Sequence, residues 1–178
     1  MSEGKVREQE AEEYVWQDGC RGPRKAPWPP WISRLTALPF AAMFCLGAYI
    51  LYSSSTVRLA IWLGVIAFAV FPGRYLLCAR CPYYGQRCST LLGLFTPFLH
   101  KKQEGKSMKL GLWLDLLEMI ALFLIPIVDA WRVGGAWMLA LWILVSAGAF
   151  LTLTRLACPS CSFTFCPIGR AGRAFGRR

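Results

Sequence analysis

Six of the eight cysteines fall into two short runs whose spacing suits metal binding. Residues 78–88 read CARCPYYGQRC, and residues 158–166 read CPSCSFTFC. A C-x2-C pair lets two thiolates reach one metal from a single turn, as in zinc and iron–sulfur proteins. The runs therefore predict metal ligands, namely Cys78, Cys81, Cys88, Cys158, Cys161 and Cys166.

Each run supplies three cysteines, one fewer than a four-cysteine zinc or [4Fe–4S] site needs. The remaining ligand could come from Cys20, from His100, or from the other run. A proline follows Cys81, Cys158 and Cys166. Cysteine-proline steps follow cluster ligands in bacterial ferredoxins, which favours iron–sulfur, although rigid proline turns also suit zinc. The cofactor, iron–sulfur cluster or zinc, stays open, as do palmitoylation and unligated structural thiols.

Two carboxylates, Asp115 and Glu118, interrupt the apolar segment 109–128 and share one helix face because they are three residues apart. Ionisable groups inside a membrane are costly and by default functional candidates. The sequence predicts a proton or cation path along Asp115 and Glu118. The alternative is a structural ion pair with Arg74, which enters the same leaflet from the preceding span.

The elements that carry these residues are long apolar segments. The chain has 178 residues, 56% of them hydrophobic and 17% charged. Soluble domains have about 25% charged residues. Because segments 35–57 and 133–154 carry no charge, and a bilayer-spanning helix needs about 20 residues, we expect an integral membrane protein. We expect spanning helices at 35–52, 58–77, 109–128 and 134–156, with a kink at Phe71-Pro72-Gly73.

The orientation follows from the distribution of basic residues, which favour the cytoplasmic side. Basic residues are abundant in the N-terminal segment, between Arg74 and Lys109, and after Arg155, whereas the two hairpin loops hold only Arg58 and Arg132. We therefore expect a multi-pass protein with both termini and both cysteine runs in the cytoplasm.

An internal repeat links the two runs. At an offset of 80 residues, segment 57–81 matches 137–161 at nine of 25 positions, including Trp62 with Trp142 and both cysteines of each C-x2-C pair. The predicted fold is an all-α membrane four-helix bundle. It is built from two tandem helix pairs, with a cysteine-rich cytoplasmic segment after helices 2 and 4.

The chain divides into five parts on this basis. Residues 1–34 form a cytoplasmic segment with a Pro/Trp-rich stretch, whose Trp28 and Trp31 we expect at the lipid headgroups. Residues 35–88 and 108–166 are the two helix pairs. Residues 89–107 are a basic interfacial loop, packed over the cysteines, and 167–178 a basic tail.

Several function classes are excluded and three remain. The net charge of +10 is spread along a membrane surface, so we expect membrane lipids and a protein partner in a membrane complex rather than nucleic acid. We expect a redox or electron-transfer protein with a cytoplasmic-face cysteine metal centre. The alternatives are a non-catalytic zinc- or thiol-stabilised assembly subunit and a metal-ion or thiol carrier. The sequence does not decide whether the protein is an enzyme, since no catalytic triad or phosphate-binding loop is evident.

Overall fold

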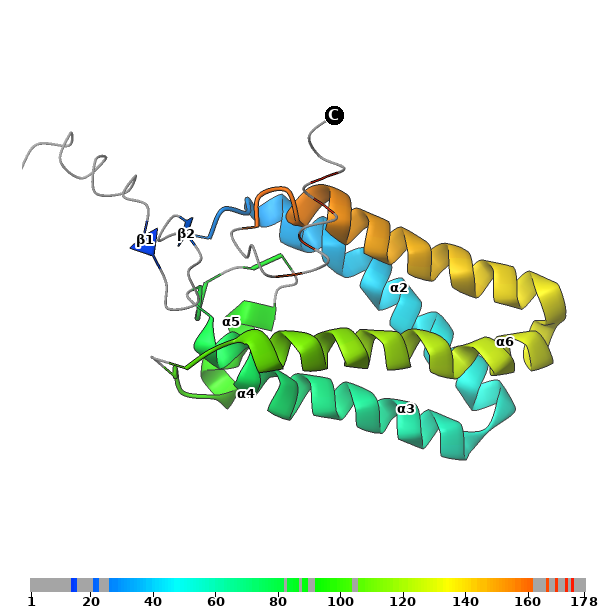
Figure 1. Cartoon of the computed structure of the whole chain (residues 1–178). Coiled ribbons are helices and arrows are strands. Elements are labelled where there is room, and N and C mark those ends of the chain that lie inside the picture. Colours follow the sequence, from blue (N-terminus) through cyan, green and yellow to red (C-terminus); the bar gives the residue numbers. More distant parts are fainter. Residues whose placement is uncertain are drawn as a thin grey trace, which may run out of the picture.

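The computed structural model describes residues 26–81, 83–86, 88–89, 92–103 and 106–161, together with 14–15, 21–22, 166, 169, 172 and 174. Long helices make up the fold (Figure 1). The strands among the described residues are β1 (Tyr14–Val15) and β2 (Arg21–Gly22), which pair antiparallel with Tyr14 opposite Gly22. The all-α prediction therefore holds for the architecture.

Three helical segments are long and apolar enough to cross a membrane. They carry many large apolar side chains on their outer surfaces, as lipid-facing helices do. This agrees with a membrane protein. The segments are Pro30–Ser54, which is α2, Thr56–Arg80, which begins with α3 (Thr56–Phe68), and Lys109–Ala157, which begins with α6 (Lys109–Thr152).

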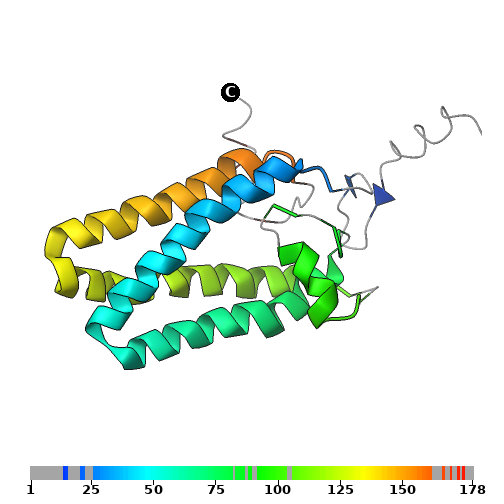
Figure 2. The ribbon, with the colours of Figure 1, turned by 180° about the vertical axis from the view of Figure 1, so that it is seen from behind.

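Helix α6 contains a sharp chain reversal. Gly134 and Gly135 leave helical geometry, and Gly135 has φ 59°, a value that favours glycine because it has no Cβ. The helix consequently doubles back, and its two arms, 109–133 and 136–152, run side by side (Figures 1 and 2). The spans expected at 109–128 and 134–156 lie one in each arm of this element, which counts once among the three long apolar helical segments.

Proline chemistry explains how the first arm meets α3. Pro126 has no N–H, so the carbonyl of Leu122, four residues earlier, loses its helical partner. The indole Nε1 of Trp62 donates a hydrogen bond of 3.1 Å to that carbonyl. Trp62 is buried, and its hydrogen bond joins the middle of α3 to the middle of the first arm of α6.

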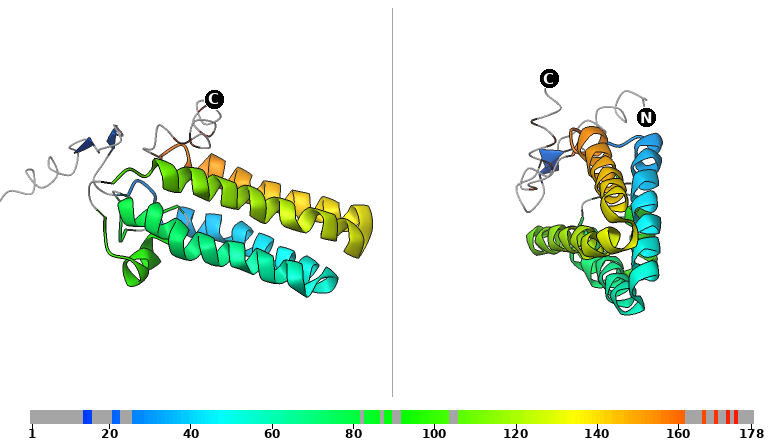
Figure 3. Two further views of the ribbon diagram at one scale, coloured as in Figure 1. Left: turned by 60° about the horizontal axis from the view of Figure 1, so that its bottom comes forward. Right: turned by 90° about the vertical axis from the view of Figure 1, so that its right-hand side faces the viewer.

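Trp142 on the second arm makes the corresponding contact, because its Nε1 donates to the carbonyl of Phe123 at 3.2 Å. Gly47 of α2 lies against both rings. A Cβ atom at Gly47 would be 3.0 Å from Trp62 and 3.2 Å from Trp142. Glycine therefore allows α2 to approach both tryptophans, the same two that the 80-residue offset aligns. Figure 3 shows α2, α3 and the two arms of α6 packed along one another.

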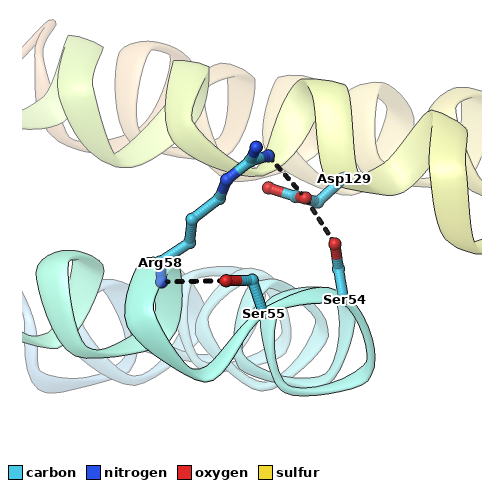
Figure 4. A network of polar contacts seen from close by, with 4 residues as sticks. All are labelled: Ser54, Ser55, Arg58 and Asp129. Carbon is cyan, nitrogen blue, oxygen red and sulfur yellow. Dashed lines mark hydrogen bonds and ion pairs between the residues drawn. The ribbon is translucent and has the colours of Figure 1, made fainter.

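A polar cluster joins the helix ends far from the cysteines (Figure 4). Asp129 is fully buried, pairs with Nη1 of Arg58 at 2.7 Å and accepts a hydrogen bond of 2.5 Å from Ser54 Oγ. The hydroxyl of Ser55 caps the start of α3 through the amide of Arg58. Asp129 is not among the residues predicted from the sequence. Its position at the end of an apolar span is nevertheless a signal, because a carboxylate there requires a charged or hydrogen-bonding partner.

Candidate metal centre

One cavity of about 200 Å³ lies at the end of the molecule where α2 begins. All six cysteines of the two runs line it, and none of the six is in a disulfide. Other walls come from the start of α6 and from the segment before α2. The structure thus brings together two runs that are 80 residues apart in the sequence.

The first run is delivered by an irregular helix end. The predicted kink at Phe71-Pro72-Gly73 falls in a π-helix, η1 (Ala69–Gly73), which α4 (Arg74–Leu76) and the 3-10 turn η2 (Cys78–Arg80) follow. Proline inside η1 disturbs the helical hydrogen bonds and turns the chain. The short helix α5 (Leu92–Leu99) packs against η2, which contains Cys78; its location at the membrane interface stays a prediction.

The second run leaves α6 in a similar way, through the π-helix η3 (Leu153–Ala157). The two C-x2-C turns have the same backbone hydrogen bond. The amide of Cys81 donates to the carbonyl of Cys78 at 3.2 Å, and the amide of Cys161 to that of Cys158 at 3.1 Å. Each turn therefore holds its two cysteines in the same backbone relation.

The segment before α2 covers the cavity. Trp28 is 8% exposed and its ring meets Tyr83 edge to face, with centroids 5.5 Å apart. Its Nε1 donates to the carbonyl of Ala157 at 2.9 Å. Both tryptophans were expected at the lipid headgroups. Trp31 is 55% exposed and is free to lie there, whereas Trp28 is buried beside the cysteines.

One cation and one carboxylate share the cavity wall. Nη2 of Arg74 pairs with Oδ1 of Asp115 at 3.1 Å, and Nη1 of Arg74 lies 3.9 Å from Sγ of Cys78. The predicted alternative of an ion pair with Arg74 is therefore correct for Asp115. Arg74 also places positive charge beside Cys78 in the cavity wall.

Glu118 has no such partner. It is 6% exposed, and neither carboxylate oxygen has a hydrogen-bond partner among the described residues. Both oxygens lie 3.1 Å from the position of a Cβ atom at Gly73. Asp115 lines the cysteine cavity, whereas the Glu118 carboxylate lies against Gly73 of η1, so the structure separates two carboxylates that the sequence grouped.

Burial disfavours the ionised form of Cys81. It raises the pKa of the Cys81 thiol, and the neighbouring Cys78, Cys88 and Cys161 raise this pKa further, while a hydrogen bond from the Tyr83 backbone opposes them. Without a metal, Cys81 is therefore a neutral thiol at physiological pH. A metal that displaces the proton would reverse this preference.

Of the remaining candidate ligands, the structure describes His100. His100 Nε2 donates to the carbonyl of Phe71 at 3.0 Å and its ring meets Tyr75 with centroids 5.5 Å apart. His100 is not among the residues that line the cavity. Cys20 lies outside the described residues, and Cys45 is exposed on α2.

The cysteines surround the cavity without meeting at one point. Within the described ranges, no three His, Cys, Asp or Glu side chains are arranged as ligands of one metal ion. Comparison with family models, with curated proteins and with solved structures found no match to this chain.

Proposed function

We propose that the protein is a multi-pass membrane protein whose two cysteine runs hold one iron–sulfur cluster, which carries electrons at the cytoplasmic face of the membrane. A single observation carries the proposal, namely that all six cysteines line one cavity. The ligands would be Cys78, Cys81, Cys158 and Cys161, because their two turns share the same backbone hydrogen bond.

The size of the cavity favours a cluster over a single zinc ion. A metal ion with four thiolates has all its sulfurs about 2.3 Å away, so it needs little space of its own. A volume of about 200 Å³ is several times the ~30 Å³ of one water molecule. The burial of the cavity under Trp28 also suits a redox centre, because solvent exposure and nearby charges set the potential of a cluster.

The proposal that the cysteine end lies on the cytoplasmic side is supported by the distribution of basic residues. The described basic residues at the cysteine end outnumber those at the opposite end, where Arg58 and Arg132 lie. Basic residues favour the cytoplasmic face and anionic lipid headgroups. Those at the cysteine end are Arg34, Arg74, Arg80, Lys101, Lys102, Lys106, Lys109 and Arg155.

We further propose that the two arms of α6, together with α2 and α3, form a four-helix bundle that arose by tandem duplication. Trp62 and Trp142, which the 80-residue offset aligns, are both buried and both lie against Gly47, which supports the duplication. So do the matched C-x2-C turns.

The test is anaerobic purification in detergent, followed by visible spectroscopy and by iron, sulfide and zinc analysis. We expect a brown protein with broad visible absorption that dithionite bleaches. Cys81→Ser and Cys161→Ser should each lose the colour, while Cys45→Ser, which changes an exposed cysteine away from the cavity, should keep it.

Other results would point to another function. A colourless protein with stoichiometric zinc, lost in the same two variants, would replace the redox proposal with an assembly subunit stabilised by zinc. A protein without metal in which the Cys45 variant behaves like the other two would refute a metal centre.

A further inference from the structure

A groove runs along the outside of the molecule where the start of α2 lies beside the end of α6 and η3 (Figures 1 and 2). Its volume is about 670 Å³, within the ~300–1,000 Å³ typical of small-molecule sites. From Leu35 to Ala42 it extends about 10 Å along the axis of α2, which is most of the ~15 Å depth of one leaflet. Its apolar lining comes from Leu35, Leu38, Pro39, Ala42, Leu151 and Leu156.

One end of this groove is positively charged. Arg155 of η3 lines it and is exposed, and Arg34, which is also exposed, directly precedes Leu35 on α2. The hydroxyl of Thr152, which lines the groove as well, donates within its own helix to the carbonyl of Gly148 at 2.7 Å. Among the described lining residues, Arg155 is the ionisable one, so a ligand in the groove has a guanidinium as its polar contact.

The same end of the groove holds a hydrogen-bond acceptor. Pro39 has no N–H, so the carbonyl of Leu35, four residues earlier, loses its helical partner. The start of α2 packs against η3, where Ile32 shares a core cluster with Ala157, so this carbonyl and Arg155 lie at one level of the bundle. A ligand that combines an anion with hydroxyl donors would satisfy both groups.

The surroundings of this end select a lipid. Trp31 is 55% exposed one turn before Leu35, and exposed tryptophan and arginine at the end of an apolar span are typical of the headgroup zone. Leu38 is 67% exposed and lies one turn further into the apolar part. A phospholipid supplies both a phosphate for the guanidinium and an acyl chain for the apolar part, whereas a soluble anion supplies only the first.

We infer that the groove binds an anionic phospholipid with hydroxyls in its headgroup, such as phosphatidylglycerol, with the phosphate at Arg155 and an acyl chain between α2 and α6. Helix η3 is common to the groove and to the cysteine cavity. Its residues Arg155 and Leu156 line the groove, while Leu153 and Ala157 line the cavity. The bound lipid therefore contacts the segment that leads directly into Cys158, and its binding does not depend on the proposed cluster.

The test is native mass spectrometry of the full-length protein, reconstituted with equal parts of phosphatidylglycerol and phosphatidylcholine and then released into mild detergent. We expect the protein to retain phosphatidylglycerol in preference to phosphatidylcholine. Arg155→Gln should lower this preference about tenfold, the equivalent of one charge-assisted hydrogen bond. Arg132→Gln changes an exposed arginine at the opposite end of the molecule and should leave the preference unchanged.

A second pair of variants tests the apolar part of the groove. Leu38→Trp should reduce retention of phosphatidylglycerol, because the larger ring fills the groove. Leu144→Trp is the matched control, since Leu144 is 71% exposed on the second arm of α6, close to the 67% of Leu38, and does not line the groove. It should retain lipid as the wild type does.

Three results would overturn the site. Equal retention of the two lipids by the wild type, or equal losses in Arg155→Gln and Arg132→Gln, would mean that the groove does not recognise the headgroup. Displacement of the lipid by inorganic phosphate would make Arg155 a site for soluble anions instead. Iron is measured on the same samples. Lipid retention without iron would contradict the cluster and keep the lipid site, whereas iron without lipid retention would do the opposite.

Discussion

Gly111 of α6 lies directly against the backbone that leads into the first cysteine run. A Cβ atom at Gly111 would be 2.6 Å from the carbonyl carbon and oxygen of Leu76 and 2.9 Å from the amide nitrogen of Leu77. Ordinary contact begins at 3.4 Å, so Gly111→Ala requires the two backbones to separate by about 0.8 Å. Since all three atoms belong to the backbone, no side-chain rotation relieves the contact.

Overpacking of this kind costs about 1–3 kcal/mol of unfolding free energy. Alanine returns up to about 1 kcal/mol through its higher helix propensity. Gly148→Ala has only this second effect, because no atom lies within 4 Å of its Cβ position. The two variants should therefore differ by about 1–3 kcal/mol, with Gly111→Ala the less stable.

The same displacement reaches the proposed ligands, because Cys78 directly follows Leu77. Metal–ligand distances tolerate about 0.2 Å, which is less than the separation that the added methyl group would impose. Gly111→Ala should therefore lower iron per chain, measured beside thermal unfolding monitored by tryptophan fluorescence in one detergent. If Gly111→Ala matches Gly148→Ala in both stability and iron content, the close packing of α6 against α4 does not position the cysteines.

Three further predictions concern the cover, the thiols and the polar cluster. Asp129→Ala removes a buried ion pair and a hydrogen bond and should lower the unfolding free energy by about 2–3 kcal/mol; thermal unfolding beside Arg132→Ala, an exposed neighbour, measures this, and equal stability of the two variants would contradict it. Trp28→Phe loses the indole hydrogen bond that closes the cavity, worth about 1 kcal/mol, so bleaching of the visible absorption in air should accelerate about fivefold. Trp31→Phe should not change the rate. No acceleration in Trp28→Phe would show that this bond does not close the cavity. In metal-free protein the pKa of Cys81 is raised. The pH at which iodoacetamide alkylates half of Cys81 should therefore lie above about 8.5, the pH at which a free thiol ionises. The stability that the neutral thiol contributes is present below that pH and is lost as the pH rises; mass spectrometry of the labelled peptide between about pH 7 and pH 10 checks the shift, and half-maximal labelling at about pH 8.5 would contradict burial of this thiol.

The apolar segments could be predicted because their signal is local. Gaps in the charge pattern and high hydropathy are properties of single segments, so they survive any arrangement of the helices. The charge pattern also predicts a reversal between the last two spans, but the form of that reversal depends on Gly135 at φ 59°. This backbone conformation lets helical hydrogen bonding run almost to the turn on both sides, which the charge pattern alone does not show.

The site could be predicted as far as the repeat reaches. An offset of 80 residues brings equivalent helix ends together, and the structure places the six cysteines around one cavity. Contacts without such a pattern were missed. Trp28 donates a hydrogen bond to Ala157, 129 residues later in the chain. Arg74 forms an ion pair with Asp115 and not with Glu118, and this pairing depends on how η1 directs α4 toward α6. Neither relation leaves a periodic trace in the sequence.

The cavity draws its walls from residues as distant in the chain as Trp28 and Cys166. Ribosomal synthesis delivers these positions in order, so the enclosure exists only after the second arm of α6 has entered the bilayer and folded back. A group held there would have to be inserted after both arms of α6 have folded, while the segment at Trp28 is still open. Maturation of the protein would then be a separate step from its insertion, and a delivery factor would have to act on a chain already anchored in lipid.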